Sequence, residues 1–246
     1  MNWHLVTFAN EKFLDKQKYL HDIHAEEFCH HIYTRDWLET TEFYTENKEL
    51  LDAPIGAGWW AWKPYVISEA MKHAEDGDYI LYCDCGDMFS PGLRLYVEKE
   101  MNDTDDISML LISNNMNGQY TKRDCFVLMN CDEEDYWNER QLECGFMVWK
   151  VTDATRTVMS EWQKYCLDPR IINNDSSTEG EELEGFVAHR NDQSILTNLA
   201  IRDGLTVGGP EFRNYVECDY DYWYERGGVG FGRQIDQFLN AIKEDA

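Results

Sequence analysis

The sequence predicts an α/β fold, with one domain spanning residues 1–246 around a central, mostly parallel sheet. Short apolar runs alternate with helix-like periodicities, and several connections are longer than hairpin turns, which is typical of strand–helix units. The 246 residues contain no internal repeat and no linker rich in Pro, Gly or Ser. Hydrophobic residues make up 43% of the chain and include 9 Trp, enough for an extensive core.

The first half of the chain predicts a strand, a helix, a second helix and a second strand. Residues 4–10 are β-prone and stop at Asn10, and a four-residue apolar periodicity over 20–28 then indicates a helix. Pro64 suits the first turn of the next helix, which we expect to end at Gly77. The continuous apolar run 78–83 is typical of a strand buried on both faces of a sheet.

The second half continues the alternation. Strands are expected at 107–112 and 145–149. Asp153 is expected to cap the helix that follows, and Asp192 to open another that Gly204 ends. These elements complete the predicted sheet and its helical layers.

Two segments of the second half stand outside this alternation. Residues 173–184 are acidic and almost free of apolar side chains, which indicates a solvated loop or, alternatively, a lid that orders over a ligand. A final helix at 234–246 is expected to pack on the outside.

The chain is strongly acidic. Lys and Arg number 22 against 47 Asp and Glu, which gives a formal net charge of −25. Such a surface repels polyanions, so it argues against nucleic acid and anionic membranes as partners and favours a neutral or cationic acceptor region. A need for solubility or saline surroundings would produce the same charge.

Nothing in the sequence predicts export or a membrane span. No apolar run reaches about 18 residues, and the first ten residues lack the basic and apolar regions of a signal peptide. The eight Cys are scattered, so we expect reduced thiols, no bridge between Cys83 and Cys85, and a cytoplasmic location. The oligomeric state is not indicated.

The sharpest chemical signal is Asp84 and Asp87, directly after the buried strand that ends at Cys83. In open α/β sheets ligands bind beyond the carboxyl ends of the strands. Two carboxylates there suit a hard divalent cation that takes its other ligands from water and phosphate. An acidic turn that bonds only to its own backbone is the alternative.

Two further stretches carry candidate residues. Asp192 and Gln193 offer a carboxylate and an amide suited to gripping sugar hydroxyls, although Asp192 alone would also serve as a helix cap. The aromatic stretch 59–65 reads mainly as core. Within it, Lys63 beside Pro64 can reach a diphosphate, or else lie along the surface.

In this order and spacing the stretches resemble the glycosyltransferases of the GT-A fold, a Rossmann-like nucleotide-sugar-binding fold. The nearest likeness is to small bacterial and viral enzymes related to glycogenin and the lipopolysaccharide galactosyltransferases. It covers most of residues 3–205. The resemblance implies a hexosyl- or pentosyltransferase that moves a sugar from a UDP- or GDP-linked donor to a glycan, lipid-linked or protein acceptor.

The resemblance also assigns roles to residues. It implies that the first strand and its turn hold the base and ribose, that Trp62 and Lys63 lie near the donor, and that Gly145 lines the sugar pocket beside Gln193. The substrate-binding residues expected on this basis are Thr7, Phe8, Ala9, Asn10, Trp62, Lys63, Asp84, Gly145 and Gln193. Asp192 is the first candidate for the catalytic carboxylate and Glu143 the second.

The implied cofactor is Mn²⁺ or Mg²⁺, held by Asp84 and Asp87. The family pattern is Asp-x-Asp, whereas two residues separate the acids here, so either Asp87 alone ligates while Asp84 holds hydroxyls, or the site is altered. The family also supplies a late His ligand, and no His follows His189. His189 or an acid among Glu217, Asp219 and Asp221 is expected to replace it.

Two rival functions remain from the sequence. One is a non-catalytic nucleotide- or glycan-binding module of the same fold, which the altered spacing of Asp84 and Asp87 supports. The other is a metal-dependent nucleotidyltransferase, which needs a Gly-rich basic loop that the residues after Asn10 do not provide.

Overall fold

The computed structural model describes residues 1–90, 92–102 and 104–218. Its centre is a five-stranded sheet in the order β2-β1-β3-β6-β5. β1, β2 and β3 run parallel, and β6 runs antiparallel to both of its neighbours, so four of the five strands share one direction. The strands are β1 (Trp3–Ala9), β2 (Cys29–Thr34), β3 (Tyr79–Cys83), β5 (Ser108–Met116) and β6 (Arg140–Lys150). The predicted α/β fold with a mostly parallel sheet is confirmed.

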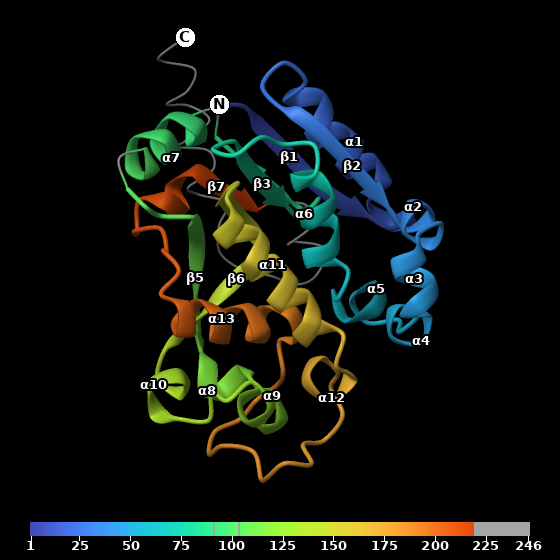
Figure 1. Ribbon diagram of the computed structural model, residues 1–246, viewed down its shortest axis with the longest axis vertical. Coiled ribbons are helices and arrows are strands. Elements are labelled where there is room, and N and C mark those ends of the chain that lie inside the picture. Colours follow the sequence, from blue (N-terminus) through green and yellow to red (C-terminus); the bar gives the residue numbers. More distant parts are fainter. Residues whose placement is uncertain (91, 103, 219–246) are drawn as a thin grey trace.

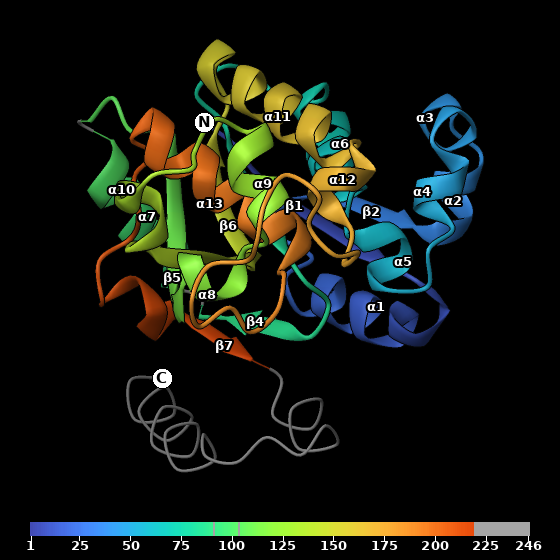
Figure 2. The same ribbon diagram turned by 90° about the horizontal axis from the view of Figure 1, so that it is seen from below.

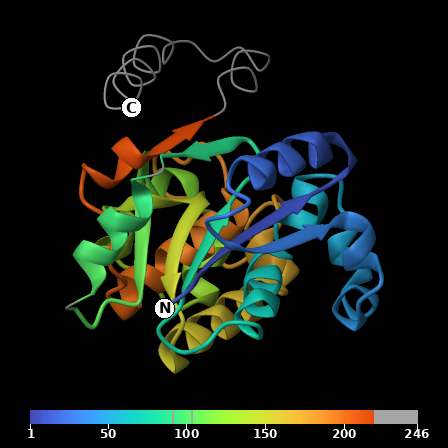
Figure 3. The same cartoon turned by 90° about the horizontal axis from the view of Figure 1, so that it is seen from above.

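Helices cover both faces of this sheet (Figures 1 and 2). One face carries α6 (Lys63–Met71), α11 (Asp153–Cys166) and α13 (Asn191–Asp203), whose apolar residues form the larger core with the strands. The other face carries α1 (Leu14–Ile23) and α7 (Leu93–Met101) over a second, smaller core. Figure 3 shows the same layers from the opposite side. The sheet is therefore buried on both faces, as its apolar strands require.

The remaining elements are short. β4 (Asp87–Phe89) and β7 (Val216–Cys218) pair antiparallel and form a second, two-stranded sheet. The others are η1 (Glu11–Phe13), α2 (Arg35–Glu39), α3 (Glu42–Glu46), α4 (Lys48–Leu51), α5 (Gly56–Trp59), α8 (Asn117–Tyr120), α9 (Arg123–Leu128), α10 (Glu134–Trp137), α12 (Pro169–Ile172) and η2 (Phe212–Tyr215).

Several predicted boundaries are wrong. α1 ends at Ile23 rather than continuing through 28, and α6 ends at Met71, with Gly77 (φ +91°) in the turn beyond it. Gly204 does end α13, with the left-handed φ of +64° that favours glycine.

Both predicted aspartate caps are also wrong. Thr152, not Asp153, caps α11 and accepts a hydrogen bond from the Thr155 amide. Asp192 is the second residue of α13, whose N-cap is Arg190 with no side-chain cap bond. The carboxylate of Asp192 is therefore available for another role.

The described thiols fit the expected reduced state. Cys85 is a free thiol whose Sγ lies 3.3 Å from the Phe8 carbonyl, so it forms no bridge to Cys83. Within residues 1–90, 92–102 and 104–218, no helix is long and apolar enough to cross a membrane. The predicted helix at 234–246 and the alternative ligands Asp219 and Asp221 lie outside the described residues.

Candidate active site

The candidate site lies at the carboxyl ends of β1 and β3. These neighbouring strands are parallel, so both end at the same edge of the sheet. Asp84 follows β3 directly, and its amide donates to the Gly145 carbonyl of β6 at 2.7 Å. The Asp87 amide closes the turn by donating to the Asp84 carbonyl at 2.9 Å. These two backbone hydrogen bonds therefore fix the positions from which the Asp84 and Asp87 side chains extend.

Both carboxylates face Gly145. A Cβ added at this glycine would lie 2.9 Å from Asp87 Oδ2 and 3.2 Å from Asp84 Oδ2, closer than real Cβ contacts allow without movement. The absence of a side chain at Gly145 is what lets the two acids approach this strand. The Asp84 side chain is 41% exposed, so the pair stands at the mouth of the site rather than in the core.

Lys63, the first residue of α6, joins the acids from the helical layer. Its side chain is only 3% exposed, and its Nζ donates to the Cys144 carbonyl at 2.8 Å. The same Nζ lies 3.3 Å from Asp192 Oδ2 and 3.6 Å from Asp84 Oδ1. Three residues far apart in the sequence, all predicted as site residues, thus meet at one ammonium group.

The charges of this cluster depend on one another. Burial raises the pKa of Asp192 to about 6, against the opposing attraction of Lys63. Burial also disfavours the charge of Lys63, but Asp192 and Asp84 together hold its pKa above the ordinary value. At neutral pH the ammonium stays charged, and it partly offsets the cost of burying a carboxylate that is 6% exposed.

Asp192 retains unused bonding capacity. Its Oδ2 is buried and forms no hydrogen bond of good geometry with any residue that the structure describes, although Lys63 opposes its charge. A buried acceptor without a hydrogen bond is costly, and such groups recur at binding and catalytic sites. This oxygen can accept a hydroxyl proton from a bound molecule.

Residues with left-handed backbone conformation lie just before Lys63 and just before Asp192. Trp59 and Trp60, just before α6, have φ of 56° and 58°, and Asn191, just before Asp192, has φ of 48°. Non-glycine residues rarely adopt this conformation, and it concentrates at functional sites. Close packing holds the segment before α6 in place. Gly58 lies so near the Leu51 backbone that a Cβ added at Gly58 would be 2.6 Å from the Cα of Leu51.

Aromatic side chains form the walls. The Tyr82 hydroxyl donates to Asp84 Oδ1 at 2.6 Å, and its ring lies 5.0 Å from Lys63 Nζ. Trp62 stacks on Phe8 with ring centroids 3.8 Å apart, and its Nε1 donates to the Gly56 carbonyl. Sequence reasoning missed Tyr82. The only available signal was a hydroxyl-bearing residue two positions before Asp84, on the same side of the strand.

The remaining first-strand residues flank this cluster. Ala9 is buried at the end of β1. The Thr7 hydroxyl is buried against Gln17 Nε2 at 2.9 Å and His21 Nε2 at 2.8 Å. The Asn10 side chain caps η1 by accepting from the Lys12 amide. The role of this strand end in holding a nucleotide stays a prediction.

His189 forms its hydrogen bonds with two backbone groups. Its Nδ1 accepts from the Lys122 amide at 3.2 Å, and its Nε2 donates to the Ile171 carbonyl at 2.8 Å. Burial, with Lys122 adding to it, lowers its pKa to about 3, so the ring is neutral. Both ring nitrogens are thus engaged in this arrangement, and the role of His189 as a metal ligand stays a prediction.

Glu143 and Gln193 also have partners of their own. Glu143 Oε1 binds Arg213 Nη2 at 2.8 Å, in an ion pair with both side chains partly exposed. Gln193 Nε2 donates to Gln141 Oε1 at 3.0 Å, within a buried amide network. Neither contact joins these residues to Lys63. Of the two candidate carboxylates, Asp192 rather than Glu143 therefore lies in the charged cluster.

The residues at the mouth fit a hard divalent cation. Asp84 and Asp87 supply carboxylate oxygens, the ligands that Mn²⁺ and Mg²⁺ accept alongside water and phosphate. The two oxygens nearest Gly145 occupy the space that a larger residue would fill. In the part of the chain that the structure describes, no three His, Cys, Asp or Glu side chains are grouped to hold a metal. Among the described residues, the mouth offers the two carboxylates of Asp84 and Asp87 as ligands.

The fold and site define an α/β protein with a charged, carboxylate-lined site at the carboxyl edge of its sheet. No protein-family model and no curated protein matches the chain. Among solved structures, mouse xyloside xylosyltransferase 1 in its apo form is similar over 84% of this chain and 84% of its own, with 10% identity and a TM-score of 0.47.

Two more solved structures are similar. A glycosyltransferase involved in the glycosylation of the major capsid of PBCV-1 matches over 65% of each chain, with 10% identity and a TM-score of 0.33. The galactosyltransferase LgtC, in complex with donor and acceptor sugar analogs, matches over 83% of this chain and 72% of its own, with 12% identity and a TM-score of 0.38. All three are named as glycosyltransferases. At this distance the likenesses carry no argument about activity.

Proposed function

We propose that this chain is a GT-A glycosyltransferase that moves a hexosyl or pentosyl group from a UDP- or GDP-linked donor to a glycan, lipid-linked or protein acceptor. One observation supports it most: buried Lys63 joins Asp84, at the mouth, to Asp192, inside the site. A cation beside a pair of acids suits a diphosphate, and a carboxylate with an unused oxygen suits a hydroxyl. We propose the cytoplasm as its location, in keeping with thiols such as Cys85.

The chemistry follows from these positions. The acceptor oxygen forms a bond to the anomeric carbon while the bond from that carbon to the phosphate oxygen breaks, and the nucleoside diphosphate leaves with the bonding electrons. Asp192 takes the proton of the acceptor hydroxyl, or faces the positive charge that develops on the sugar ring. Lys63 holds the Asp192 carboxylate in place and keeps it ionised at neutral pH.

Asp84 and Asp87 would hold Mn²⁺ or Mg²⁺ in this proposal. The bound cation would neutralise charge on the departing diphosphate. Tyr82 orients one Asp84 oxygen through its hydroxyl, which leaves Oδ2 on the side of Gly145.

Nucleotide binding tests the proposal directly. Calorimetry with UDP and GDP, with and without Mn²⁺, is expected to show that the metal tightens one nucleotide by at least about tenfold. Asp87→Ala should abolish that gain, whereas Asp153→Ala, on the exposed surface of α11, should retain it. Equal affinity with and without metal, or an unaffected Asp87→Ala, would refute the assigned site.

Two activity assays separate the rival functions. Slow hydrolysis of a nucleotide sugar without any acceptor identifies a transferase, whereas binding with no hydrolysis identifies a binding module. Release of pyrophosphate from a nucleoside triphosphate would identify a nucleotidyltransferase instead. A thermal-shift panel of nucleotide sugars with Mn²⁺ selects the donor, because a ligand of the folded state raises its stability.

A further inference from the structure

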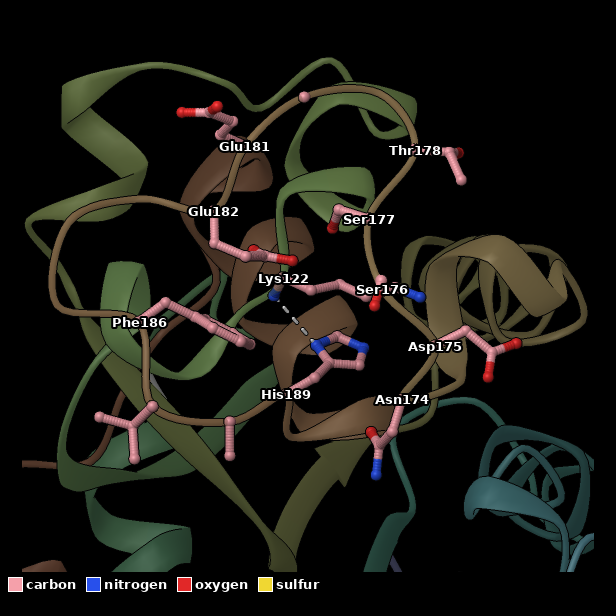
Figure 4. A pocket seen from close by; sticks show the side chains of 13 residues that line it. Lys122, Asn174, Asp175, Ser176, Ser177, Thr178, Glu181, Glu182, Phe186 and His189 are labelled. Atoms are coloured by element: carbon pink, nitrogen blue, oxygen red, sulfur yellow. Dashed lines mark hydrogen bonds between the residues drawn. The ribbon is translucent and has the colours of Figure 1, made fainter.

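A hollow lies within the acidic loop. It has a volume of about 810 Å³ and opens inside the turn of chain between α12 and α13. Figure 4 shows the loop curving around it, with Phe186 on one side, Ser176 and Ser177 across from it, and His189 with Asn174 at the lower edge. A volume of this size falls within the range of ligand-binding pockets in proteins.

The loop is fastened in this open shape by α9. The Asp124 carboxylate accepts the amides of Thr178 and Glu179, each at 2.7 Å. In return, Glu182 Oε2 accepts the Arg123 amide at 2.8 Å, and Ser177 Oγ accepts the Asp124 amide at 3.2 Å. These reciprocal bonds give part of the acidic segment a structural task, which the prediction of a purely solvated loop did not include.

The residues that line the hollow are mainly polar, and Phe186 adds one aromatic ring. Lys122 is buried, and its Nζ, which has three donors, forms one described bond, to Asn173 Oδ1 at 2.8 Å. Asn174 and the hydroxyls of Ser176 and Ser177 add both donors and acceptors. The half-buried ring of Phe186 offers an apolar face. Hydroxyl donors and acceptors over an aromatic face match a pyranose ring.

Charge narrows the class of ligand further. Three lining carboxylates, Asp175, Glu181 and Glu182, outnumber the single ammonium of Lys122. His189 adds no charge, because burial keeps its ring neutral. A phosphorylated, sulfated or otherwise polyanionic molecule would be repelled, whereas a neutral polyhydroxylated one would not.

The hollow reaches the start of α13, the helix that carries Asp192. Its wall residue His189 precedes Asp192 by three positions, and the chain between them is held in place. Asn191 Nδ2 donates to Asn174 Oδ1 at 3.1 Å and to the Ile172 carbonyl at 2.6 Å. A ligand in the hollow is therefore next to the start of α13, the helix that carries the candidate base.

We propose that this hollow is the acceptor subsite and that it takes a neutral oligosaccharide. This rests on the proposed glycosyltransferase function and specifies its acceptor as a glycan rather than a protein or a lipid-linked anion. Phe186 packs against a sugar face, Lys122 and the loop hydroxyls bind sugar hydroxyls, and the acceptor hydroxyl is presented toward Asp192.

Steric closure of the hollow tests the proposal. Ser176 is exposed and forms no described hydrogen bond, so Ser176→Trp should fill the hollow without disturbing the fold. The matched control is Ser160→Trp, at another exposed serine, which lies on α11 and lines a different groove, beside α6. Melting temperatures of both variants are measured on the same samples.

Binding is measured by saturation-transfer NMR without nucleotide, using lactose, cellobiose, maltose and xylobiose, with a heparin disaccharide and hexalysine as charged probes. We expect at least one neutral disaccharide to bind, Ser176→Trp to weaken it by at least about tenfold, and Ser160→Trp to leave it unchanged. In transfer assays the same disaccharide should be glycosylated, with a raised KM in Ser176→Trp.

Three results would overturn the proposal: no neutral disaccharide binds at millimolar concentration, both tryptophan variants behave alike, or only a charged probe binds. Failure of Mn²⁺-dependent nucleotide binding is distinct from these. It would refute the transferase function, and with it the acceptor role, while disaccharide binding would still identify a glycan site.

Discussion

Lys63→Met is expected to destabilise the protein strongly at neutral pH. Lys63 and Asp192 are both buried, their charged atoms lie 3.3 Å apart, and Asp192 Oδ2 forms no hydrogen bond within the described residues that would replace the lost partner. Removal of one member of a buried ion pair typically costs about 3–5 kcal/mol, because the remaining group must either stay charged without its partner or take up a proton. We expect a loss of that size in the free energy of unfolding at pH 7.

The loss should depend on pH with a defined sign. Burial raises the folded-state pKa of Asp192 to about 6 even with Lys63 present, and without Lys63 it rises further. A carboxyl whose folded pKa exceeds its unfolded value gains stability as pH falls through the folded pKa. If the loss of Lys63 lifts this folded-state pKa above 7, the free energy of unfolding of the variant rises by about 2.7 kcal/mol between pH 7 and pH 5, two pH units at about 1.36 kcal/mol each. The free energy of unfolding of the wild type rises by only about half of that, because its Asp192 begins to protonate near pH 6. The difference in stability between wild type and Lys63→Met therefore shrinks by about 1.4 kcal/mol from pH 7 to pH 5.

Urea unfolding at both pH values measures these quantities. Lys72→Met is the matched control, since Lys72 follows the same helix but is largely exposed and its described ion pair is with Glu69. It should change stability by under about 0.5 kcal/mol. The double variant Lys63→Met/Asp192→Asn should recover at least about 1 kcal/mol of the loss at pH 7. Two results would refute the importance of this ion pair: a loss of stability below about 1 kcal/mol in Lys63→Met at pH 7, or a difference from wild type that is no smaller at pH 5.

Three further outcomes test the site. Asp192→Asn should lower the transfer rate by about a hundredfold or more while nucleotide affinity stays nearly intact, and normal turnover in a folded variant would exclude Asp192 as base. Glu143→Gln, which breaks only a partly exposed pair with Arg213, should cost under about 1 kcal/mol of stability and little activity; a hundredfold rate loss there would move the catalytic role to Glu143. Gly145→Ala should weaken metal-dependent nucleotide binding by about tenfold or more in calorimetry, since its methyl group would meet Asp87 and Asp84, and unchanged affinity would show that the two acids do not act at this point.

The sequence predicted the parts of the site that depend on residue type and strand ends. Asp84 and Asp87 follow an apolar strand, so a sheet-edge position was expected for them. Lys63 was singled out as a cation beside the first turn of a helix. The residue spacing could not show that Lys63, Asp84 and Asp192 meet at one ammonium group, because that depends on how α6 packs against β1 and β3 and α13 against β6.

Two other features could not be predicted from the sequence, because they depend on contacts between distant segments. β2 has the sequence Cys-His-His-Ile-Tyr-Thr, with no apolar alternation, and is recognisable only from its pairing at the edge of the sheet beside β1. His189 was a candidate ligand because the resemblance implies a late His ligand and no His follows it in the sequence. Its partners, the Lys122 amide and the Ile171 carbonyl, come from segments far away in the chain, so no local pattern reveals them.

Asp192 shows how burial decides between two readings of one residue. A helix-capping aspartate needs only the nearby backbone amides and stays largely solvated, and its removal is felt in stability. Asp192 instead lies within the first turn of α13, is buried, and relies on the charge of Lys63, from another helix. Its environment costs stability, because desolvation raises the energy of the ionised form. A carboxylate held ionised at such a cost, with one oxygen outside any hydrogen bond to the described residues, fits the proposed role of binding a partner better than that of a helix cap.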